Sequence, residues 1–320
     1  PKFSFFIFYN IGIQNISIGS DSEYFMTTGS YNFAAGYQAN YYNVTGSNNV
    51  ALGHQAGYGV TSSSHNNNNF IGYQSAYGNT TGGNGTALGF KSMYTNTTGK
   101  YNTGLGHSSL YSNSTGVRNT AVGYYSAYGS SNMDNGTFLG YNAGRTITSG
   151  DNDTFIGYLA ANGATTASYS TAIGSNALAF PSTGARNTAV GYMAGEGSSG
   201  SNFSNGSFLG YNTGIALTTG RNNTMLGYGA GIAATAGNGH ILMGYQAGDA
   251  ITTAARDIVI GYDIDAPSTT LGGQLTIGNL IFGNGLTATT GTTISGGKVG
   301  INKANPTYTL DVNGTTFTKI

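Results

Sequence analysis

Residues 118–124 read Arg-Asn-Thr-Ala-Val-Gly-Tyr, and close variants of this stretch return along most of the chain. An aliphatic residue, a glycine and then usually an aromatic residue recur every 17 residues, with two spacings of 19. Self-similarity at a fixed short period is typical of stacked repeat folds, so the repeat outweighs every other local signal. The glycines that mark it are Gly19, Gly36, Gly53, Gly72, Gly89, Gly106, Gly123, Gly140, Gly157, Gly174, Gly191, Gly210, Gly227, Gly244, Gly261 and Gly278.

The residues before each marking glycine predict a short β-strand. Polar and apolar residues alternate with period 2 in this stretch, and turn residues follow it. Stacked repeats place like residues above one another in parallel strands about 4.8 Å apart. The stack buries an apolar face that one repeat cannot bury alone. We therefore predict an all-β fold, a parallel β-solenoid (β-roll) of about sixteen 17-residue coils.

Alternation within the strand also assigns its two faces. If the aliphatic residue before the glycine points into the coil, the residue two positions earlier points inward as well. The small or aromatic residue between them, such as Ala121 or Phe138, is then predicted to point outward. The predicted inward ladder comprises Val122, Ile156, Thr120 and Thr137.

Glycine and tyrosine form two further ladders. Gly123 and Gly140 stand where a strand glycine either marks a close backbone approach or relieves a bend, and the sequence leaves both open. Tyr124 and Tyr141 belong to the aromatic position after the glycine. A ladder that continues through most repeats favours packing between coils or chains, although an exposed row of rings could also bind sugars.

Composition excludes several classes of function. Eleven basic and eleven acidic residues give no net charge, so we expect no nucleic-acid partner. No run of 18 apolar residues occurs, so we expect no membrane insertion. The chain has no cysteine, which excludes disulfides and thiolate chemistry.

The repeat divides the chain into three segments. Residues 1–18 are predicted to be an N-terminal strand or docking segment, and residues 19–278 form the repeat solenoid. The period fails after Gly278, so residues 279–320 are predicted to be a C-terminal β cap.

Few residues are candidates for chemistry. Asp134 and Asp151 occupy the same position in adjacent repeats, a spacing of about 5 Å that could suit a carboxylate pair or a cation. A solvated turn is the favoured interpretation of both. The histidines are interpreted as structural or exposed, and sequons such as Asn43, Asn79, Asn96, Asn113, Asn135 and Asn152 as products of the repeat composition. We expect no cofactor and no enzymatic activity.

Two stretches resemble known families. Repeats written Asn-Thr-Ala-Val-Gly-Tyr-x-Ala-Gly resemble the head repeats of trimeric autotransporter adhesins, which implies a trimeric β-roll. The segment Lys298 to Thr315, KVGINKANPTYTLDVNGT, is similar to the junction of phage tail fibres. That resemblance implies a following C-terminal intramolecular chaperone that trimerises the fibre and is then cleaved off.

These features predict a structural fibre or adhesin shaft, part of a virion appendage or a cell surface, that contributes to host attachment. The expected partners are two further copies of the chain, other fibre or baseplate proteins and host surface glycan. The predicted trimer packs through the outward alanine, glycine and phenylalanine positions. The alternatives are a polysaccharide-degrading tailspike enzyme and a solenoid that binds glycan or ice. Ice binding is disfavoured because the threonine ladder is predicted to point inward.

Overall fold

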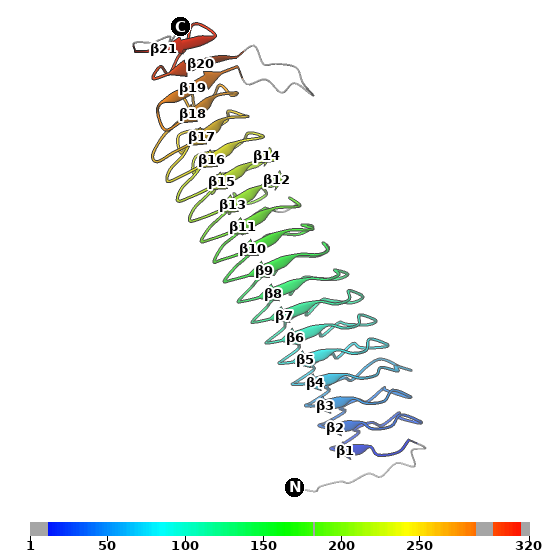
Figure 1. The fold of residues 1–320 in the computed structure, drawn as a ribbon. Helices are drawn as coiled ribbons and strands as arrows, with labels where there is room; N and C mark the ends of the chain where they lie inside the picture. Colours follow the sequence, from blue (N-terminus) through cyan, green and yellow to red (C-terminus); the bar gives the residue numbers. More distant parts are fainter. Residues whose placement is uncertain (1–11, 182, 286–296, 315–320) are drawn as a thin grey trace. The chain divides into compact units, whose positions relative to one another are not determined.

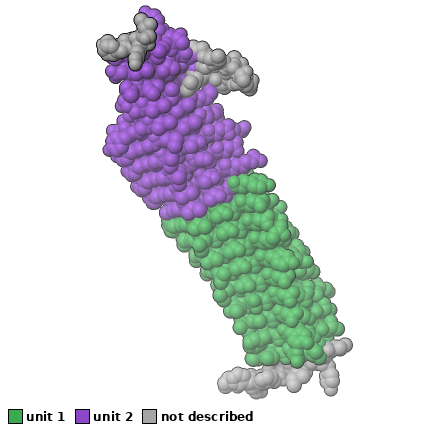
Figure 2. Space-filling model, viewed as in Figure 1, with its two compact units in different colours: residues 1–169 green, residues 170–320 purple. Residues whose placement is uncertain are grey.

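The computed structural model describes residues 12–181, 183–285 and 297–314. These residues form strands, turns and bends and contain no helix. The chain divides into two compact parts, an N-terminal unit (residues 1–169) and a C-terminal unit (residues 170–320), coloured separately in Figure 2.

Nearly every strand is three residues long. The strands of the N-terminal unit are β1 (Ile16–Ile18), β2 (Phe33–Ala35), β3 (Val50–Leu52), β4 (Asn69–Ile71), β5 (Thr86–Leu88), β6 (Thr103–Leu105), β7 (Thr120–Val122), β8 (Thr137–Leu139) and β9 (Thr154–Ile156). Those of the C-terminal unit are β10 (Thr171–Ile173), β11 (Thr188–Val190), β12 (Asn202–Ser204), β13 (Ser207–Leu209), β14 (Thr219–Arg221), β15 (Thr224–Leu226), β16 (Ile241–Met243), β17 (Ile258–Ile260), β18 (Leu275–Ile277), β19 (Ile281–Asn284), β20 (Lys298–Ile301) and β21 (Leu310–Val312).

In the N-terminal unit each repeat forms one coil, and successive coils stack in parallel from β1 to β9 (Figure 1). Thr120 pairs with Thr137 and Val122 with Leu139, so equivalent residues lie opposite one another. The 19-residue repeat keeps this register, since Val50 pairs with Asn69. The predicted parallel β-solenoid is confirmed.

The C-terminal unit is also built of parallel stacked coils, but its last strands pair differently. Strands β10, β11, β13, β15, β16, β17 and β18 stack in parallel, while β12 and β14 form a small separate sheet. The parallel stack ends at β18, because β19 pairs with it in the antiparallel direction. Strand β20 then pairs antiparallel with β19, and β21 pairs parallel with β20.

The predicted assignment of the two strand faces is wrong. Ala121 and Phe138, expected outward, are fully buried. Val122 and Ile156, expected inward, are only half-buried, and Thr120 and Thr137 are exposed. Period 2 fixes which residues share a face, but a shift of one residue inverts both faces, so alternation alone cannot choose between them.

The interior of each coil is filled by two side chains of complementary size, one from the middle of the strand and one six residues later. Phe138 is buried in the strand of its coil, and a Cβ added to Gly144, six residues later, would collide with the Phe138 ring. Where the position six residues on is large, the strand residue is small. Such pairs are Ala87 with Met93, Gly104 with Leu110, and Ala172 with Leu178. This compensation keeps the narrow interior close-packed, which protein cores require.

A buried amide column satisfies the inner backbone. The backbone N–H of Asn49 donates to the Asn32 side-chain oxygen at 3.0 Å, and the Asn49 side-chain oxygen accepts from the Asn68 N–H at 3.1 Å. The Asn49 side-chain nitrogen also donates to the carbonyl oxygen of His65 at 2.8 Å. Each asparagine therefore holds polar groups that would be costly to leave unpaired in the interior.

Candidate interaction surface

The outward face of the coils carries three columns of side chains: a threonine column and an aliphatic column from the strand, and an aromatic column after the marking glycine. In the N-terminal unit, Thr137 is exposed, Leu139 is 46% exposed and Tyr141 is 45% exposed. Equivalent residues repeat this pattern on neighbouring coils. Contiguous exposed apolar surface is uncommon on monomeric proteins and marks an interaction surface.

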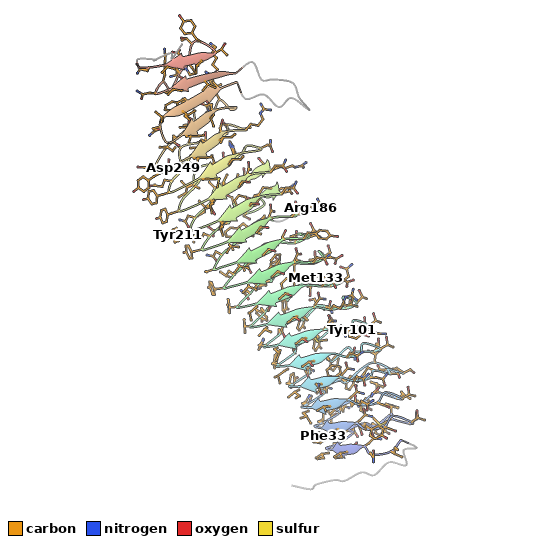
Figure 3. All side chains as sticks on the ribbon, viewed as in Figure 1. Phe33, Tyr101, Met133, Arg186, Tyr211 and Asp249 are labelled. Atoms are coloured by element: carbon orange, nitrogen blue, oxygen red, sulfur yellow. The ribbon has the colours of Figure 1, made fainter. Side chains whose placement is uncertain are left out.

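The aromatic column is a continuous stack of rings. In the N-terminal unit, the Tyr124 and Tyr141 ring centroids lie 5.4 Å apart with nearly parallel planes, and Tyr141 and Tyr158 repeat this spacing. In the C-terminal unit a second stack runs through Tyr192, Tyr211, Tyr228, Tyr245 and Tyr262, at centroid separations of 4.8 to 5.2 Å. Figure 3 shows Tyr211 at the outer edge of its coil.

This stacking decides how the rings can be used. A ring inside the stack has a neighbouring ring on each face, so only its edge and hydroxyl reach the surface. Proteins bind sugars on the faces of aromatic rings, because the sugar C–H groups pack against the negative ring face, so sugar binding requires a free face. The geometry therefore favours packing over sugar binding by stacked tyrosines.

The marking glycines lie where successive coils approach too closely to leave room for a side chain. Gly123 has a φ of +131°, and a Cβ added to it would lie under 3.0 Å from the carbonyl group of Gly140. The same conflict recurs from Gly140 to Gly157. The approach is to the next coil of the same chain, so these glycines serve coil stacking rather than contact with another chain.

The sequence analysis did not predict a further column of stacked rings, which is separate from the aromatic column. In the N-terminal unit a tyrosine stands five residues after seven consecutive marking glycines. We name these residues the tyrosine column: Tyr24, Tyr41, Tyr58, Tyr77, Tyr94, Tyr111 and Tyr128. Successive centroids lie 4.8 to 5.4 Å apart. The repeat alone could have revealed this column, had the fifth position after each glycine been compared.

Polar groups lie between the aromatic and tyrosine columns. The Gln55 side-chain nitrogen donates to the Gln38 side-chain oxygen at 3.0 Å, and Gln74 donates to Gln55 at 2.8 Å. Further along, the Lys91 ammonium lies 5.5 Å from the centroid of Phe90 in one column and 5.2 Å from that of Tyr94 in the other. Lys91 therefore bridges the two columns, whereas the glutamines form a hydrogen-bonded ladder from coil to coil.

Asp134 and Asp151 are neighbours, as their shared position predicts. The Asp151 carboxylate accepts the backbone N–H of Asp134 at 2.9 Å, and the Asp134 carboxylate accepts that of Val117 at 2.8 Å. Both carboxylates thus continue the backbone hydrogen bonding of a turn. Within the described residues no group of three or more histidine, cysteine, aspartate or glutamate side chains could hold a metal ion.

The sequons fall into two structural groups. The side chains of Asn43, Asn79, Asn96 and Asn113 are buried, and the last three are joined in a ladder of side-chain hydrogen bonds. Asn135 and Asn152 are exposed at turns. Of these six sequons, Asn135 and Asn152 are the two open to modification in the folded chain.

The histidines have different roles. His54 and His107 stack in the aromatic column. His65 is fully buried in the N-terminal unit, and burial lowers its pKa to about 4. The fold therefore requires this ring to be neutral.

His240 and Asp257 replace asparagines of the buried amide column in the C-terminal unit. The His240 Nε2–H donates to the carbonyl oxygen of Ala254 at 2.8 Å, in place of an asparagine side chain. The Asp257 Oδ1 accepts the Gln274 N–H at 2.9 Å, whereas its buried Oδ2 lacks a hydrogen-bond partner within the described residues. Burial raises the pKa of Asp257 to about 6 and lowers that of His240.

Replacing Asp257 with asparagine should therefore stabilise the C-terminal unit at neutral pH. When folding raises the pKa of an acid, the acid stabilises the folded state fully at a pH below its unfolded pKa, here near 4. That stabilisation is lost as the pH rises through the folded pKa of about 6. We expect Asp257→Asn to gain on the order of 2 kcal/mol at pH 7, since an amide carries no charge and can donate.

Denaturant unfolding of both proteins at pH 4 and pH 7 checks this expectation. The gain should shrink toward pH 4, and His240 contributes to that change, because its Nδ1 lies 3.7 Å from the Asp257 Oδ2 and loses an acidic neighbour in the variant. A variant no more stable than the parent at pH 7 would contradict a buried, ionised Asp257.

The loop between β20 and β21 is held by one carboxylate. Asp311 in β21 accepts hydrogen bonds from the Thr307 N–H at 2.7 Å and the Thr307 hydroxyl at 2.9 Å. The Lys303 ammonium lies 2.9 Å from the same oxygen. These hydrogen bonds, the Thr307 N–H first among them, lower the pKa of Asp311 to about 2. The carboxylate fixes the loop between β20 and β21; Thr315, the end of the junction motif, lies outside the described residues.

Comparison of the chain with family models, with curated proteins and with solved structures gave no match. Among the described residues, no helix has the length and apolarity needed to cross a membrane.

Proposed function

We propose that this protein is the structural shaft of a fibre on a virion or cell surface, where it contributes to attachment to a host or another surface. The observation that carries the proposal is the in-register stacking of coils whose outward face repeats the same apolar and aromatic columns. Such a fold offers length and a repeating surface, which are the properties of a shaft. The similarity of Lys298 to Thr315 to fibre junctions points the same way.

An enzymatic role gains no support from the candidate carboxylates. Asp134 and Asp151 are engaged by backbone N–H groups at a turn, an arrangement that a structural turn explains fully. A polysaccharide-degrading site would need two carboxyl groups directed at one substrate.

Antibodies against the purified protein provide the test of the shaft. They should label thin fibres on intact virions or cells of the source and reduce their attachment to the host. Label confined to the interior of cells, or attachment unchanged at saturating antibody, would overturn the proposal.

The proposed shaft is a homotrimer that packs through the aliphatic and aromatic columns. This replaces packing through the alanine and phenylalanine positions, which lie in the interior. An aromatic side chain has roughly 150–250 Å² of surface, so eight rings about half exposed in the N-terminal unit offer on the order of 800 Å². That is the area each partner contributes to a standard protein interface. Other fibre or baseplate proteins and host glycan are the further partners we propose.

Two aspartates in the aliphatic column should dissociate the trimer. Leu88 and Leu139 are 42% and 46% exposed, so Leu88→Asp with Leu139→Asp places charges on the proposed interface without entering the core. Light scattering should give about three chain masses of 32.8 kDa for the parent and one for the variant. Thr98→Asp, at an exposed turn, is the matched control and should leave the trimer intact. A parent protein that is a stable folded monomer would contradict the trimer.

A second candidate function is binding to ice, because the threonine column faces outward. Thr86, Thr103, Thr120, Thr137 and Thr154 form an in-register row beside the aliphatic column. A regular row of hydroxyl and methyl groups at the strand spacing of about 4.8 Å could order surface water. Thermal hysteresis measured on the parent and on Thr120→Tyr decides this candidate: activity in the parent that the variant loses supports it, and no activity in the parent removes it.

A further inference from the structure

The tyrosine column uses the phenol ring at all seven of its positions. The aromatic column of the same unit stacks equally well with other rings, since Tyr73, Phe90 and His107 follow one another at 5.2 and 4.7 Å. Stacking alone therefore does not require a hydroxyl. A column that holds tyrosine in seven successive coils points to a use for the phenol itself.

The geometry brings successive phenols within reach of one another. The Tyr41 and Tyr58 centroids lie 5.2 Å apart with planes 2° from parallel, and Tyr58 and Tyr77 lie 4.8 Å apart. Tyr24 at the first coil is 44% exposed, and the six that follow are half-buried. The rings are thus held in adjacent pairs while their edges remain open to a small oxidant.

We propose that the tyrosine column is a site of oxidative coupling, at which hydrogen peroxide and a haem peroxidase join tyrosines of successive coils. Each of two neighbouring phenols loses one electron and one proton, and the two phenoxyl radicals form a carbon–carbon bond between their ortho positions. The ring protons lost on rearomatisation return to the phenolic oxygens. The peroxide is reduced to two water molecules, so the two electrons and two protons balance.

Coupling in this column would staple one coil to the next. The two residues of a pair are 17 or 19 apart in sequence, so each new bond closes a loop of one coil. A covalent loop reduces the conformational entropy of the unfolded chain and therefore stabilises the folded state. For a narrow solenoid whose ends can fray, the staple would resist uncoiling.

Tyr101 supplies the internal control. It is 58% exposed at a turn, has no ring contact within the described residues, and projects from the edge of its coil in Figure 3. An oxidant that reacted by accessibility alone would choose Tyr101 over every member of the tyrosine column, since the most exposed of these, Tyr24, is 44% exposed. Coupling directed by the column would instead choose half-buried pairs.

The test is mass spectrometry of the folded chain after treatment with a haem peroxidase and limiting hydrogen peroxide. We expect cross-linked peptides that join Tyr41 to Tyr58, Tyr77 to Tyr94 and Tyr111 to Tyr128. Replacing Tyr41, Tyr77 and Tyr111 together with phenylalanine keeps the stack and leaves the remaining tyrosines of the column two coils, roughly 10 Å, apart. Cross-links from Tyr58 to Tyr42 and from Tyr128 to Tyr125, whose ring centroids lie 5.2 and 4.8 Å apart, are counted separately. Column cross-links should fall at least tenfold in this variant, while Tyr101→Phe should leave their yield unchanged.

Three results would overturn the proposal: no cross-links within the column of the parent, the same yield in the triple phenylalanine variant, or coupling dominated by Tyr101. Circular dichroism of both variants confirms that the stack is intact when they are oxidised. The shaft proposal does not depend on the result, because stacked coils need no oxidation to assemble.

Discussion

Replacing Phe138 with aspartate should unfold the N-terminal unit. The Phe138 side chain is fully buried, and its ring packs edge-on against Phe155 at a centroid separation of 5.4 Å. Losing a buried phenylalanine costs about 3–5 kcal/mol, and burying an unpaired carboxylate adds several more. The free energy of unfolding of a folded domain is only about 5–15 kcal/mol, so this one substitution should remove most or all of it.

The preceding residue provides a matched control on the same strand. Thr137 is exposed, so Thr137→Asp adds the same charge where water can solvate it and should cost under about 1 kcal/mol. Circular dichroism and limited proteolysis of the two variants measure the contrast. Equal loss of structure in both, or a fully folded Phe138→Asp, would contradict the assignment of the strand faces.

The fold could be predicted from the sequence because the repeat makes it redundant. Sixteen marking glycines at nearly constant spacing each report the same coil, and Thr120 does lie opposite Thr137 as the period requires. The direction of the faces was harder. The signal that could have decided it is Asn119, which lies two positions before Ala121 and therefore on the same face. Its buried side-chain amide donates to the carbonyl oxygen of Met133 and accepts the Gly136 N–H.

The candidate surface could be predicted only in part. Tyr124 and Tyr141 were recognised as a ladder because they adjoin the marking glycine. The tyrosine column lies further along the repeat and is confined to the first seven coils, so a comparison of all sixteen dilutes it. The antiparallel pairing of β19 with β18 could not be predicted, because that segment occurs once and carries no repeat.

Replacing Gly191 with alanine should strongly destabilise the C-terminal unit. Gly191 has a φ of +135°, a conformation that costs an L-residue about 1–3 kcal/mol. A Cβ at this position would also lie under 3.0 Å from the carbonyl group of Gly210 on the next coil, and that backbone is itself held in the stack. Separating the two coils would stretch the pairing of β11 with β13, so we expect a total loss of about 3–5 kcal/mol.

Gly200 separates backbone strain from the clash. It also has a positive φ, +82°, but an added Cβ would meet nothing within 4 Å. Gly200→Ala should therefore show only the backbone term, about 1 kcal/mol. The difference between the two variants in thermal or denaturant unfolding then measures how tightly successive coils approach. If Gly191→Ala cost no more than Gly200→Ala, the coils would have room to separate, and the glycine at every marking position would reflect chain conformation alone.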